Sequence, residues 1–411
     1  MKIKNLKDYL NSDIPFYEYS NENFLDFLSA VKFNFDIPFI QVTGTAGKSI
    51  IVNLLSNIYD SNNYSVGKVL SHDLENFSDE NEKYASFAAI FENYWKQINK
   101  YELTKYEVLF FCSLVSFKQA KNDLAIFEAY MGGYFDTCNI HETAILTVFN
   151  NAGLEHTEIL GKSASEIAYS KCGIIKPDQI VVSNTFEDDI DFVVNEECKA
   201  NKINLVKVAE FYDYNLIDYK YLEVQYFPFP KFKVNTTALY NRENIACALE
   251  VVNQLNPTFP ISNENIQNGL LKDIGYGYFD IKKIDGKTVV CDKANNPFAI
   301  EKLCKSFIFS LEDTFEDSAI LFAVDYDKNL EKMLATLTRI SHNIVLTTFN
   351  GENIRDEEGF FLFLDDYIYK MDCKDAFEYL MSDESIKNIL ITGNEKFVQL
   401  MEEFIGVRSG N

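Results

Sequence analysis

A short turn with two glycines and a lysine separates a strand-like run from a helix-like run. Residues 39–42 resemble a buried parallel strand, and residues 50–58 carry apolar side chains at helical spacing. The turn between them reads Gly-Thr-Ala-Gly-Lys-Ser over residues 44–49. Glycines allow the backbone to approach an anion, a helix start presents free N–H groups, and Lys48 adds a mobile positive charge. This arrangement predicts a phosphate-binding loop, in which Ser49 stands where such loops place a hydroxyl for Mg²⁺.

The exact form of the motif helps to distinguish a phosphate-binding loop from an ordinary strand–helix turn and from a dinucleotide site. The common pattern G-x-x-x-x-G-K-[ST] requires a glycine at position 42, where this chain has Val42, whereas the shorter form G-T-x-G-K-S fits. An ordinary strand–helix turn is the competing interpretation. A dinucleotide site is disfavoured because the spacing G-x-G-x-x-G is missing.

Polar side chains stand at or just past the ends of several predicted strands. Strands alternate with helices along the first part of the chain, which predicts a parallel sheet covered on both faces. Ligands of such sheets bind beyond the carboxyl ends of the strands. The polar residues expected at that shared rim are Lys48, Ser71, Glu128 and His156. A carboxylate there can hold Mg²⁺ against a phosphate, although a single strand-end glutamate is more often only solvated.

The amino-acid composition limits the kinds of molecule that the protein could bind and the cellular compartment in which it is expected. The 411 residues carry a net charge of −24, which argues against nucleic acid and anionic membrane surfaces as partners but leaves a small anionic ligand possible. No segment approaches the roughly 20 apolar residues of a membrane span, and the N-terminus does not resemble a signal peptide. The eight cysteines form no C-x-x-C pair, which suggests buried thiols in a cytoplasmic protein.

The chain is too long for one ordinary core, so two domains are expected. The pattern breaks around residues 274–278, and strand-like runs alternating with helices then restart. We therefore predict a first domain over residues 1–274 and a smaller α/β domain over residues 279–411. Residues 203–240 alternate in a way that predicts a small β extension.

Eight motifs, in order, resemble the folylpolyglutamate synthase / dihydrofolate synthase family of the Mur ligase superfamily. They lie at residues 42–49, 71–74, 104–107, 128–139, 153–161, 171–176, 327–328 and 389–393. The resemblance implies a P-loop parallel-sheet ATPase domain of the Mur ligase central-domain type, followed by a smaller Rossmann-like domain. It also implies an ATP-dependent amide ligase, in which a carboxylate is phosphorylated and an amine attacks the acyl phosphate.

The resemblance assigns roles to individual residues. The nucleotide would be held by Gly44, Thr45, Gly47, Lys48, Ser49, Asn244 and Asp292. Two Mg²⁺ ions are implied, with Ser71, Glu128 and His156 as ligands. Lys48, His156 and Lys171 would be catalytic, and Lys171 would be carbamylated. The pterin pocket would be lined by Thr104, Tyr106, Glu107, Phe135, Asp136 and Thr137.

The chain also departs from the family pattern. The arginine of the P-G-R hinge, which reaches ATP phosphates, is Tyr278 here, in the segment that begins at Tyr276, and the histidine of D-G-A-H-N-P is Asn295. The arginine of G-G-R is Tyr134. Losing a cation from a phosphoryl-transfer site weakens transition-state stabilisation. Lys293 lies near the lost histidine, where it either restores a charge or is an ordinary turn residue.

The resulting hypothesis is a cytoplasmic, monomeric ligase that joins L-glutamate to a reduced folate, a dihydropteroate or both, using ATP and Mg²⁺. Tyr278 and Asn295 keep two alternatives open. One is a divergent Mur-type ligase for a different carboxylate, and the other is a nucleotide- or pterin-binding homologue with weak or no ligase activity.

Overall fold

The computed structural model describes residues 3–209, 213–217, 221–275, 277–311, 316–351 and 353–409. Tyr276, in the predicted hinge, lies outside these residues. The chain divides into two compact units. Unit 1 comprises Met1–Tyr212, Tyr226–Pro230 and Glu243–Lys272, and unit 2 comprises Asp213–Gln225, Lys231–Arg242 and Asp273–Asn411.

Unit 1 is built on a six-stranded parallel sheet in the order β2-β3-β1-β4-β5-β6. Its strands are β1 (Phe39–Thr43), β2 (Val66–Val69), β3 (Leu124–Glu128), β4 (Leu146–Phe149), β5 (Ile180–Ser183) and β6 (Asn204–Lys207). Strands β1, β3 and β4 are buried along their whole length, which explains their mainly apolar sequences. The parallel sheet confirms the fold class expected from the alternation of strands and helices.

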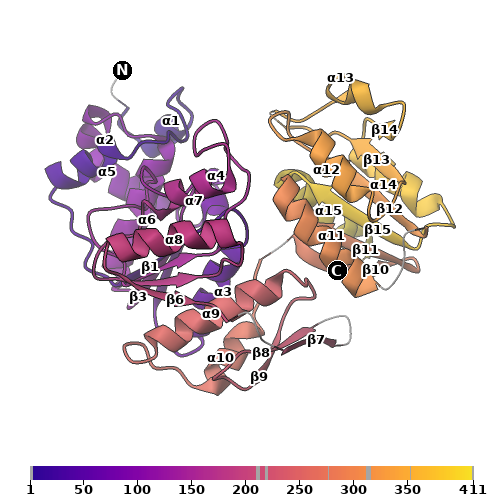
Figure 1. Cartoon of the computed structure of the whole chain (residues 1–411). Helices are drawn as coiled ribbons and strands as arrows, with labels where there is room; N and C mark the ends of the chain where they lie inside the picture. The colour runs from indigo at the N-terminus through magenta and orange to yellow at the C-terminus, as the bar shows by residue number, and fades with distance from the viewer. Residues whose placement is uncertain are drawn as a thin grey trace. The chain divides into compact units, whose positions relative to one another are not determined.

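Helices cover both faces of this sheet (Figure 1). On one face lie α5 (Tyr84–Lys100), α6 (Lys105–Ala120), α7 (Ala164–Cys172) and α8 (Asp188–Ala200), and α1 (Leu6–Leu10) and α2 (Glu22–Ala30) pack against α5. On the other face lie α3 (Lys48–Asp60), α9 (Asn241–Leu255) and α10 (Asn263–Leu270). A short helix, α4 (Ser71–Glu75), follows β2.

Local signals in the sequence explain where α6 begins. Thr104 is its N-cap and forms a capping box with Glu107, in which each side chain accepts a hydrogen bond from the other residue's backbone N–H. The next free amides, those of Lys105 and Tyr106, donate to the carbonyl groups of Pro15 and Phe16. The helix start is therefore fixed to the N-terminal segment of the chain.

Unit 2 contains a mixed sheet in the order β10-β11-β15-β12-β13-β14, in which only β10 runs antiparallel to its neighbour. Its strands are β10 (Tyr278–Ile284), β11 (Lys287–Asp292), β12 (Ser318–Ala323), β13 (Ile344–Thr347), β14 (Ile368–Lys370) and β15 (Asn388–Gly393). Its helices are α11 (Pro297–Leu311), α12 (Leu330–Leu337), α13 (Glu357–Phe360), the 3₁₀ helix η1 (Phe361–Phe363), α14 (Cys373–Ser382) and α15 (Glu395–Ser409). Helices α11 and α12 share a core on one face, and α14 and α15 share a core on the other.

A separate antiparallel sheet is formed by β7 (Asp213–Ile217), β8 (Tyr221–Gln225) and β9 (Lys231–Val234). These residues precede the predicted domain boundary, but their contacts group them with unit 2. No helix in the described part of the chain is long and apolar enough to cross a membrane.

Candidate nucleotide and metal site

The carboxyl ends of three neighbouring strands bring polar residues together in unit 1. Val42 pairs with Glu128 across β1 and β3, and Thr43 pairs with Phe149 across β1 and β4. Thr43 ends β1, Glu128 ends β3, and Asn150 follows β4. These residues therefore lie at the carboxyl ends of parallel strands, the position at which such sheets bind ligands.

Asparagine side chains hold the glycine turn in place. Asn151 Oδ1 accepts hydrogen bonds from the backbone N–H groups of Thr45, at 3.0 Å, and Ala46, at 2.9 Å. Gly47 has a φ of 79°, and a Cβ there would lie 2.5 Å from Asn244 Oδ1. Glycine is therefore required at position 47 both by its backbone conformation and by the approach of Asn244.

The start of α3 is left available to an anion. Gly47 is the N-cap residue, and no side chain caps the helix. Lys48 Nζ donates to the carbonyl oxygen of Gly44 at 2.9 Å, so the ammonium group lies over the turn. An uncapped helix N-terminus with an adjacent lysine is a suitable site for a phosphate group.

The Glu128 carboxylate links this loop to the start of α4. Its Oε1 accepts a hydrogen bond from Ser49 Oγ at 2.9 Å, and its Oε2 accepts one from the backbone N–H of Ser71 at 3.0 Å. Glu128 is buried, with 5% of its surface exposed. The structure thus brings together Glu128, Ser49 and Ser71, which the sequence assigns to the nucleotide and the metal.

Two buried hydroxyl groups at this end of the sheet make no hydrogen bond within the described residues. They are Thr43 Oγ1, which lies against Gly132, and Ser71 Oγ, in the residue whose backbone N–H donates to Glu128. Buried hydroxyls are normally paired, so these two atoms have room for a partner. One carboxylate with several hydroxyl oxygens fits Mg²⁺, which takes oxygen ligands and is usually completed by water and substrate phosphates. No cluster of three or more His, Cys, Asp or Glu side chains suited to a metal occurs in the described residues.

Lys171 is completely buried and paired with Glu155. Its Nζ lies 2.8 Å from Glu155 Oε1 and donates to the carbonyl groups of Met131, at 2.7 Å, and Gly44, at 3.2 Å. Burial lowers the pKa of Lys171, and the charge of Lys48 lowers it further, while Glu155 opposes the shift. Burial also acts to raise the pKa of Glu155, but the charges of Lys171 and Lys48 hold that pKa below its ordinary value.

The surroundings of Lys171 also require a glycine. Gly132 has a φ of 93°, and a Cβ there would lie 2.5 Å from Thr43 Oγ1 and 3.3 Å from Lys171 Nζ. Lys171, Thr43 and Gly132 therefore meet at the end of β1, which brings the predicted catalytic lysine to the phosphate loop.

His156 follows Glu155 but lies nearer to solvent. Its Nδ1 is 4.0 Å from Glu158 Oε1, and 35% of its side chain is exposed. Its φ of 44° is unusual for a residue other than glycine. The backbone N–H groups of Ile159 and Leu160 both donate to its carbonyl oxygen.

The predicted pterin-pocket residues have their polar atoms largely occupied by the fold. Thr104 and Glu107 bond to each other in the capping box, and burial raises the pKa of Glu107 to about 7. The Asp136 carboxylate accepts hydrogen bonds from the backbone N–H groups of Met131, Gly132 and Cys138. Phe135 packs against Tyr19, with ring centroids 5.6 Å apart.

The hydroxyl groups of Thr137 and Tyr106, unlike the polar atoms of these residues, are not engaged by the fold. Both are buried, and their hydroxyl groups have no hydrogen-bond partner among the described residues. They are therefore the members of the predicted pocket whose side-chain polar atoms remain available.

In unit 2, the predicted nucleotide residue Asp292 is buried and paired internally. It accepts hydrogen bonds from the hydroxyl of Tyr240 at 2.5 Å and the backbone N–H of Ala294 at 2.9 Å, and burial raises its pKa to about 7. Lys293 forms an ion pair with Glu395 at 2.8 Å and lies 4.4 Å from the centre of the Tyr278 ring. Lys293 is thus a partly buried, partnered cation next to the tyrosine that replaces the family's arginine.

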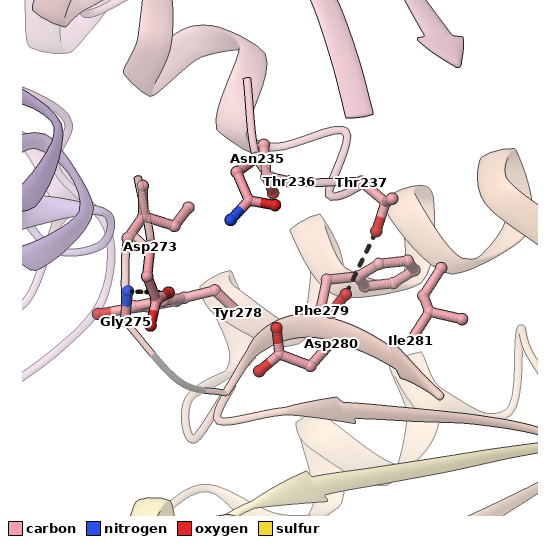
Figure 2. Close-up of a pocket in the computed structure, with 10 residues that line it drawn as sticks. Asn235, Thr236, Thr237, Asp273, Gly275, Tyr278, Phe279, Asp280 and Ile281 are labelled. Atoms are coloured by element: carbon pink, nitrogen blue, oxygen red, sulfur yellow. Dashed lines mark hydrogen bonds between the residues drawn. The ribbon is translucent and has the colours of Figure 1, made fainter. Parts of the chain in front are cut away.

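Unit 2 also contains a small cavity of about 180 Å³ (Figure 2). Its lining is mainly polar and includes Asn235, Thr236, Asp273, Tyr278 and Asp280. Clefts that hold cofactors usually measure several hundred Å³, so this cavity is too small for a nucleotide.

Several residues of the unit 1 site were not singled out from the sequence. Asn150 donates to the Ala46 carbonyl at 2.6 Å and to Asn244 Oδ1 at 3.1 Å, while Asn184 donates to Asn150 Oδ1 at 2.7 Å. Asn150 and Asn184 directly follow β4 and β5, and this position at the end of a strand is the signal that could have identified them. Glu155 lies inside the motif at residues 153–161, but the sequence does not show that it pairs with the buried Lys171.

The fold and the site together define a two-part α/β protein with a phosphate-binding loop. No family model matches the chain. It is 24% identical to the dihydrofolate synthase/folylpolyglutamate synthase of Bacillus subtilis over 341 residues, which cover 75% of this chain and 76% of that protein. It is also 24% identical to the folylpolyglutamate synthase of Lacticaseibacillus casei over 387 residues, covering 87% of each.

Solved structures show the same fold. The E. coli protein FolC in complex with ADP superposes with a TM-score of 0.84 at 20% identity, covering 99% of this chain and 98% of that one. A Mycobacterium tuberculosis folylpolyglutamate synthase complexed with ADP and AMPPCP gives 0.82 at 19% identity, covering 94% and 95%. These comparisons confirm the resemblance to the folylpolyglutamate synthase / dihydrofolate synthase family and the α/β fold class.

Proposed function

We propose that this protein is an ATP-dependent amide ligase that adds L-glutamate to a reduced folate, a dihydropteroate or both through an acyl phosphate. The observation that carries the proposal is the junction at Glu128, where one carboxylate binds the hydroxyl of the loop residue Ser49 and the backbone of Ser71. This junction combines a phosphate loop with oxygen ligands for a metal. The similar proteins named above carry the corresponding activities in their names.

The glycine loop and the start of α3 would bind the triphosphate. Gly44, Thr45 and Gly47 form the turn, and the uncapped amides of α3 face the phosphates together with Lys48. Asn244, held against Gly47 by Asn150, fixes the turn on one side. Fixed donors of this kind stabilise the charge that develops as the γ-phosphate is transferred to the substrate carboxylate. Asp292 is proposed as a further nucleotide-binding residue, as the family resemblance implies.

Ser49, Ser71 and Glu128 are the residues that would hold Mg²⁺ in unit 1, with His156 proposed at a second ion. When bound, Mg²⁺ neutralises charge on the phosphates. The Glu128 carboxylate accepts a hydrogen bond from the Ser49 hydroxyl and another from the backbone N–H of Ser71, so it holds both residues in place.

Lys171 is proposed as the residue that becomes carbamylated. The neutral amine attacks carbon dioxide to form the carbamate N–C bond, and the amine nitrogen releases one proton to water. Burial lowers the pKa of Lys171, which favours the neutral amine. The ion pair with Glu155 must separate for this step, because the paired form is the ammonium. The product carries a negative charge in place of a positive one.

The substrate pocket is proposed to include Thr104, Tyr106, Glu107, Phe135, Asp136 and Thr137. Because Thr104, Glu107 and Asp136 are engaged by the backbone, they would shape the pocket rather than contact the pterin through free polar atoms. A cytoplasmic monomer with small-molecule substrates is proposed as well. All eight cysteines are buried free thiols, an arrangement common in reducing compartments.

A second candidate is a ligase for a different carboxylate, or a binding protein with weak or no ligase activity. It is favoured by Tyr278 and Asn295, which replace a cation and an imidazole of the family pattern. The ammonium of Lys293 lies near Tyr278 but is already paired with Glu395.

One assay separates these possibilities. Phosphate release from ATP is measured with L-glutamate and a panel of reduced folates, dihydropteroate and unrelated carboxylic acids. Release with a folate or dihydropteroate supports the ligase proposed first, and release only with another acid supports a different substrate. ATP binding without release identifies an inactive homologue. Lys48→Ala should lower any genuine release by at least about 100-fold, because it removes the charge nearest the phosphates.

A further inference from the structure

Three buried asparagines form a series of hydrogen-bonded side-chain amides beside the glycine turn. They are Asn150, which follows β4, Asn184, which follows β5, and Asn244, near the start of α9. Asn184 Nδ2 donates to Asn150 Oδ1 at 2.7 Å, and Asn150 Nδ2 donates to Asn244 Oδ1 at 3.1 Å. Asn244, which the family resemblance assigns to the nucleotide, is therefore the last member of this amide series.

Two backbone carbonyl groups fix the direction of the amide series. A carbonyl oxygen only accepts hydrogen bonds, so an amide side chain that bonds to it must present its NH₂ end. Asn150 Nδ2 donates to the Ala46 carbonyl at 2.6 Å, and Asn184 Nδ2 donates to the Glu243 carbonyl at 3.3 Å. Asn184 Oδ1 makes no hydrogen bond within the described residues, so this side chain is oriented through its NH₂ end.

This direction determines which end of the Asn244 amide faces Asn150. If the Asn244 amide were reversed, the NH₂ groups of the two side chains would face each other, and a buried donor would lose its acceptor. Asn244 therefore keeps its oxygen toward Asn150 and its NH₂ group on the other side of the amide. Both ends lie at the glycine turn, because a Cβ on Gly47 would be 2.5 Å from Asn244 Oδ1 and 2.9 Å from Asn244 Nδ2.

We propose that Asn150 and Asn184 are positioning residues, which make Asn244 present a hydrogen-bond donor, and not an acceptor, to the bound nucleotide. The partner of that donor is an acceptor atom of the nucleotide, either a phosphate oxygen or an atom of the nucleoside. An amide that is oriented before the ligand arrives lowers the cost of ordering it on binding. This inference rests on the proposed function, because it requires the nucleotide to bind at the glycine turn.

The test is calorimetric titration of the full-length protein with ADP and Mg²⁺, comparing the wild type with Asn150→Ala and Asn184→Ala. Asn150→Ala should lower the affinity for ADP by about tenfold, because it removes the donor that orients Asn244. Asn184→Ala should lower it by only about threefold, because the Ala46 carbonyl still orients Asn150. The KM for ATP should rise in both variants, with the KM for the carboxylate substrate unchanged. Wild-type affinity for ADP in Asn150→Ala overturns the inference.

Asn139→Ala is the matched control for Asn184→Ala. Asn139 is also buried, its Nδ2 donates to the carbonyl groups of Tyr134 at 2.9 Å and Gly173 at 3.3 Å, and its Oδ1 has no partner in the described structure. These bonds lie outside the amide series, so the affinity for ADP should be unchanged. An equal loss in Asn139→Ala and Asn184→Ala would show a general effect of removing a buried amide and would overturn the inference.

A double-mutant cycle separates the orientation of Asn244 from support of the turn through the Ala46 carbonyl. If Asn150 acts through Asn244, adding Asn150→Ala to Asn244→Ala should cause little further loss of affinity for ADP. Fully additive losses would mean that Asn150 acts through the turn alone, which contradicts the inference.

Titration with inorganic tripolyphosphate and Mg²⁺ identifies the acceptor atom. If Asn150→Ala weakens tripolyphosphate binding as it weakens ADP binding, the acceptor is a phosphate oxygen, and if the loss is confined to ADP, the acceptor belongs to the nucleoside. Either result supports the inference. A wild-type protein that binds no ADP contradicts the proposed function itself, whereas normal wild-type binding with an unaffected Asn150→Ala variant rejects only the role of the amide series.

Discussion

Units 1 and 2 each contain a lysine–glutamate pair at the same separation but in different surroundings. Lys171 and Glu155 in unit 1 lie 2.8 Å apart, with 0% and 13% of their side chains exposed. Lys293 and Glu395 in unit 2 also lie 2.8 Å apart, with 13% and 26% exposed. The unit 1 lysine is removed from water entirely, and such a charge is unfavourable unless it is paired.

The same contrast extends to the buried hydroxyl groups. In the described part of the chain, all buried side-chain polar atoms without a hydrogen bond belong to unit 1, except for Oε1 of Glu402. The backbone N–H of Ser71 donates to Glu128, and the Thr43 hydroxyl lies against Gly132. In unit 2, by contrast, the Asp292 carboxylate accepts hydrogen bonds from Tyr240 and Ala294. Unit 1 thus keeps polar groups available for a ligand at some cost in stability, while the polar groups near Tyr278 in unit 2 stabilise one another.

The largest effect is expected from breaking the buried pair. Glu155→Gln should lower the free energy of unfolding by about 3–5 kcal/mol, because it leaves the Lys171 ammonium buried without a counter-charge. Thermal unfolding should show a midpoint lower by roughly 10 °C. The loss should become smaller as pH rises, since burial lowers the pKa of Lys171 and a neutral amine needs no partner.

The double variant Glu155→Gln/Lys171→Met provides the control, since it removes both charges. It should recover much of the lost stability, while phosphate release stays low. A Glu155→Gln variant as stable as the wild type would show that the pair is not buried as described.

A smaller, pH-dependent effect is expected at Glu402 in unit 2. Burial and the neighbouring Asp280 raise the pKa of Glu402 to about 8, from an ordinary value of 4.5. The folded protein therefore holds this proton more tightly than the unfolded chain, and the contribution to stability is fully present below about pH 4.5 and is lost as pH rises through about 8. Glu402→Gln should stabilise the protein at pH 9 by about 1–3 kcal/mol relative to wild type, and by much less at pH 5.

Thermal unfolding across this pH range measures the difference. Glu403→Gln is the matched control, because Glu403 is the exposed neighbour of Glu402 and should show no such trend. Equal pH dependence in the wild type and Glu402→Gln would refute the explanation.

The smallest effect is expected from the less buried counterpart of the first pair. Lys293→Met should cost about 1 kcal/mol or less, because Glu395, which is 26% exposed, can be solvated by water when its partner is removed. Phosphate release should fall by less than about tenfold if Lys293 only supports the turn next to Tyr278. A loss of 100-fold or more with unchanged stability would instead make Lys293 the cation that replaces the family's arginine.

The sequence predicted the parts of the molecule that depend on local pattern. The run from β1 through the glycine turn to α3 follows from apolar periodicity and glycine placement, and Glu128 was expected at the end of its strand. β10 and β14 were not expected. β14 is short and half-exposed, so it lacks the buried apolar run by which β11 or β12 is recognised.

Contacts between distant segments could not be predicted from the sequence. Nothing local shows that Asn151 holds the amides of the turn or that Glu155 pairs with Lys171, since these contacts depend on how β4 and α7 meet the loop. Tertiary contacts likewise decide that β7, β8 and β9 belong to unit 2. Their alternating sequence pattern predicts strands, but it does not predict the unit against which they pack.

The most direct test of the account is calorimetric titration of the full-length protein with ADP in the presence of Mg²⁺, comparing the wild type with Lys48→Ala. We predict saturable binding to one site in the wild type and a loss of at least about tenfold in affinity in the variant, because the ammonium over the glycine turn contacts the phosphates. Equal affinity in both proteins, or no binding to the wild type, would contradict the assignment of the nucleotide to this turn.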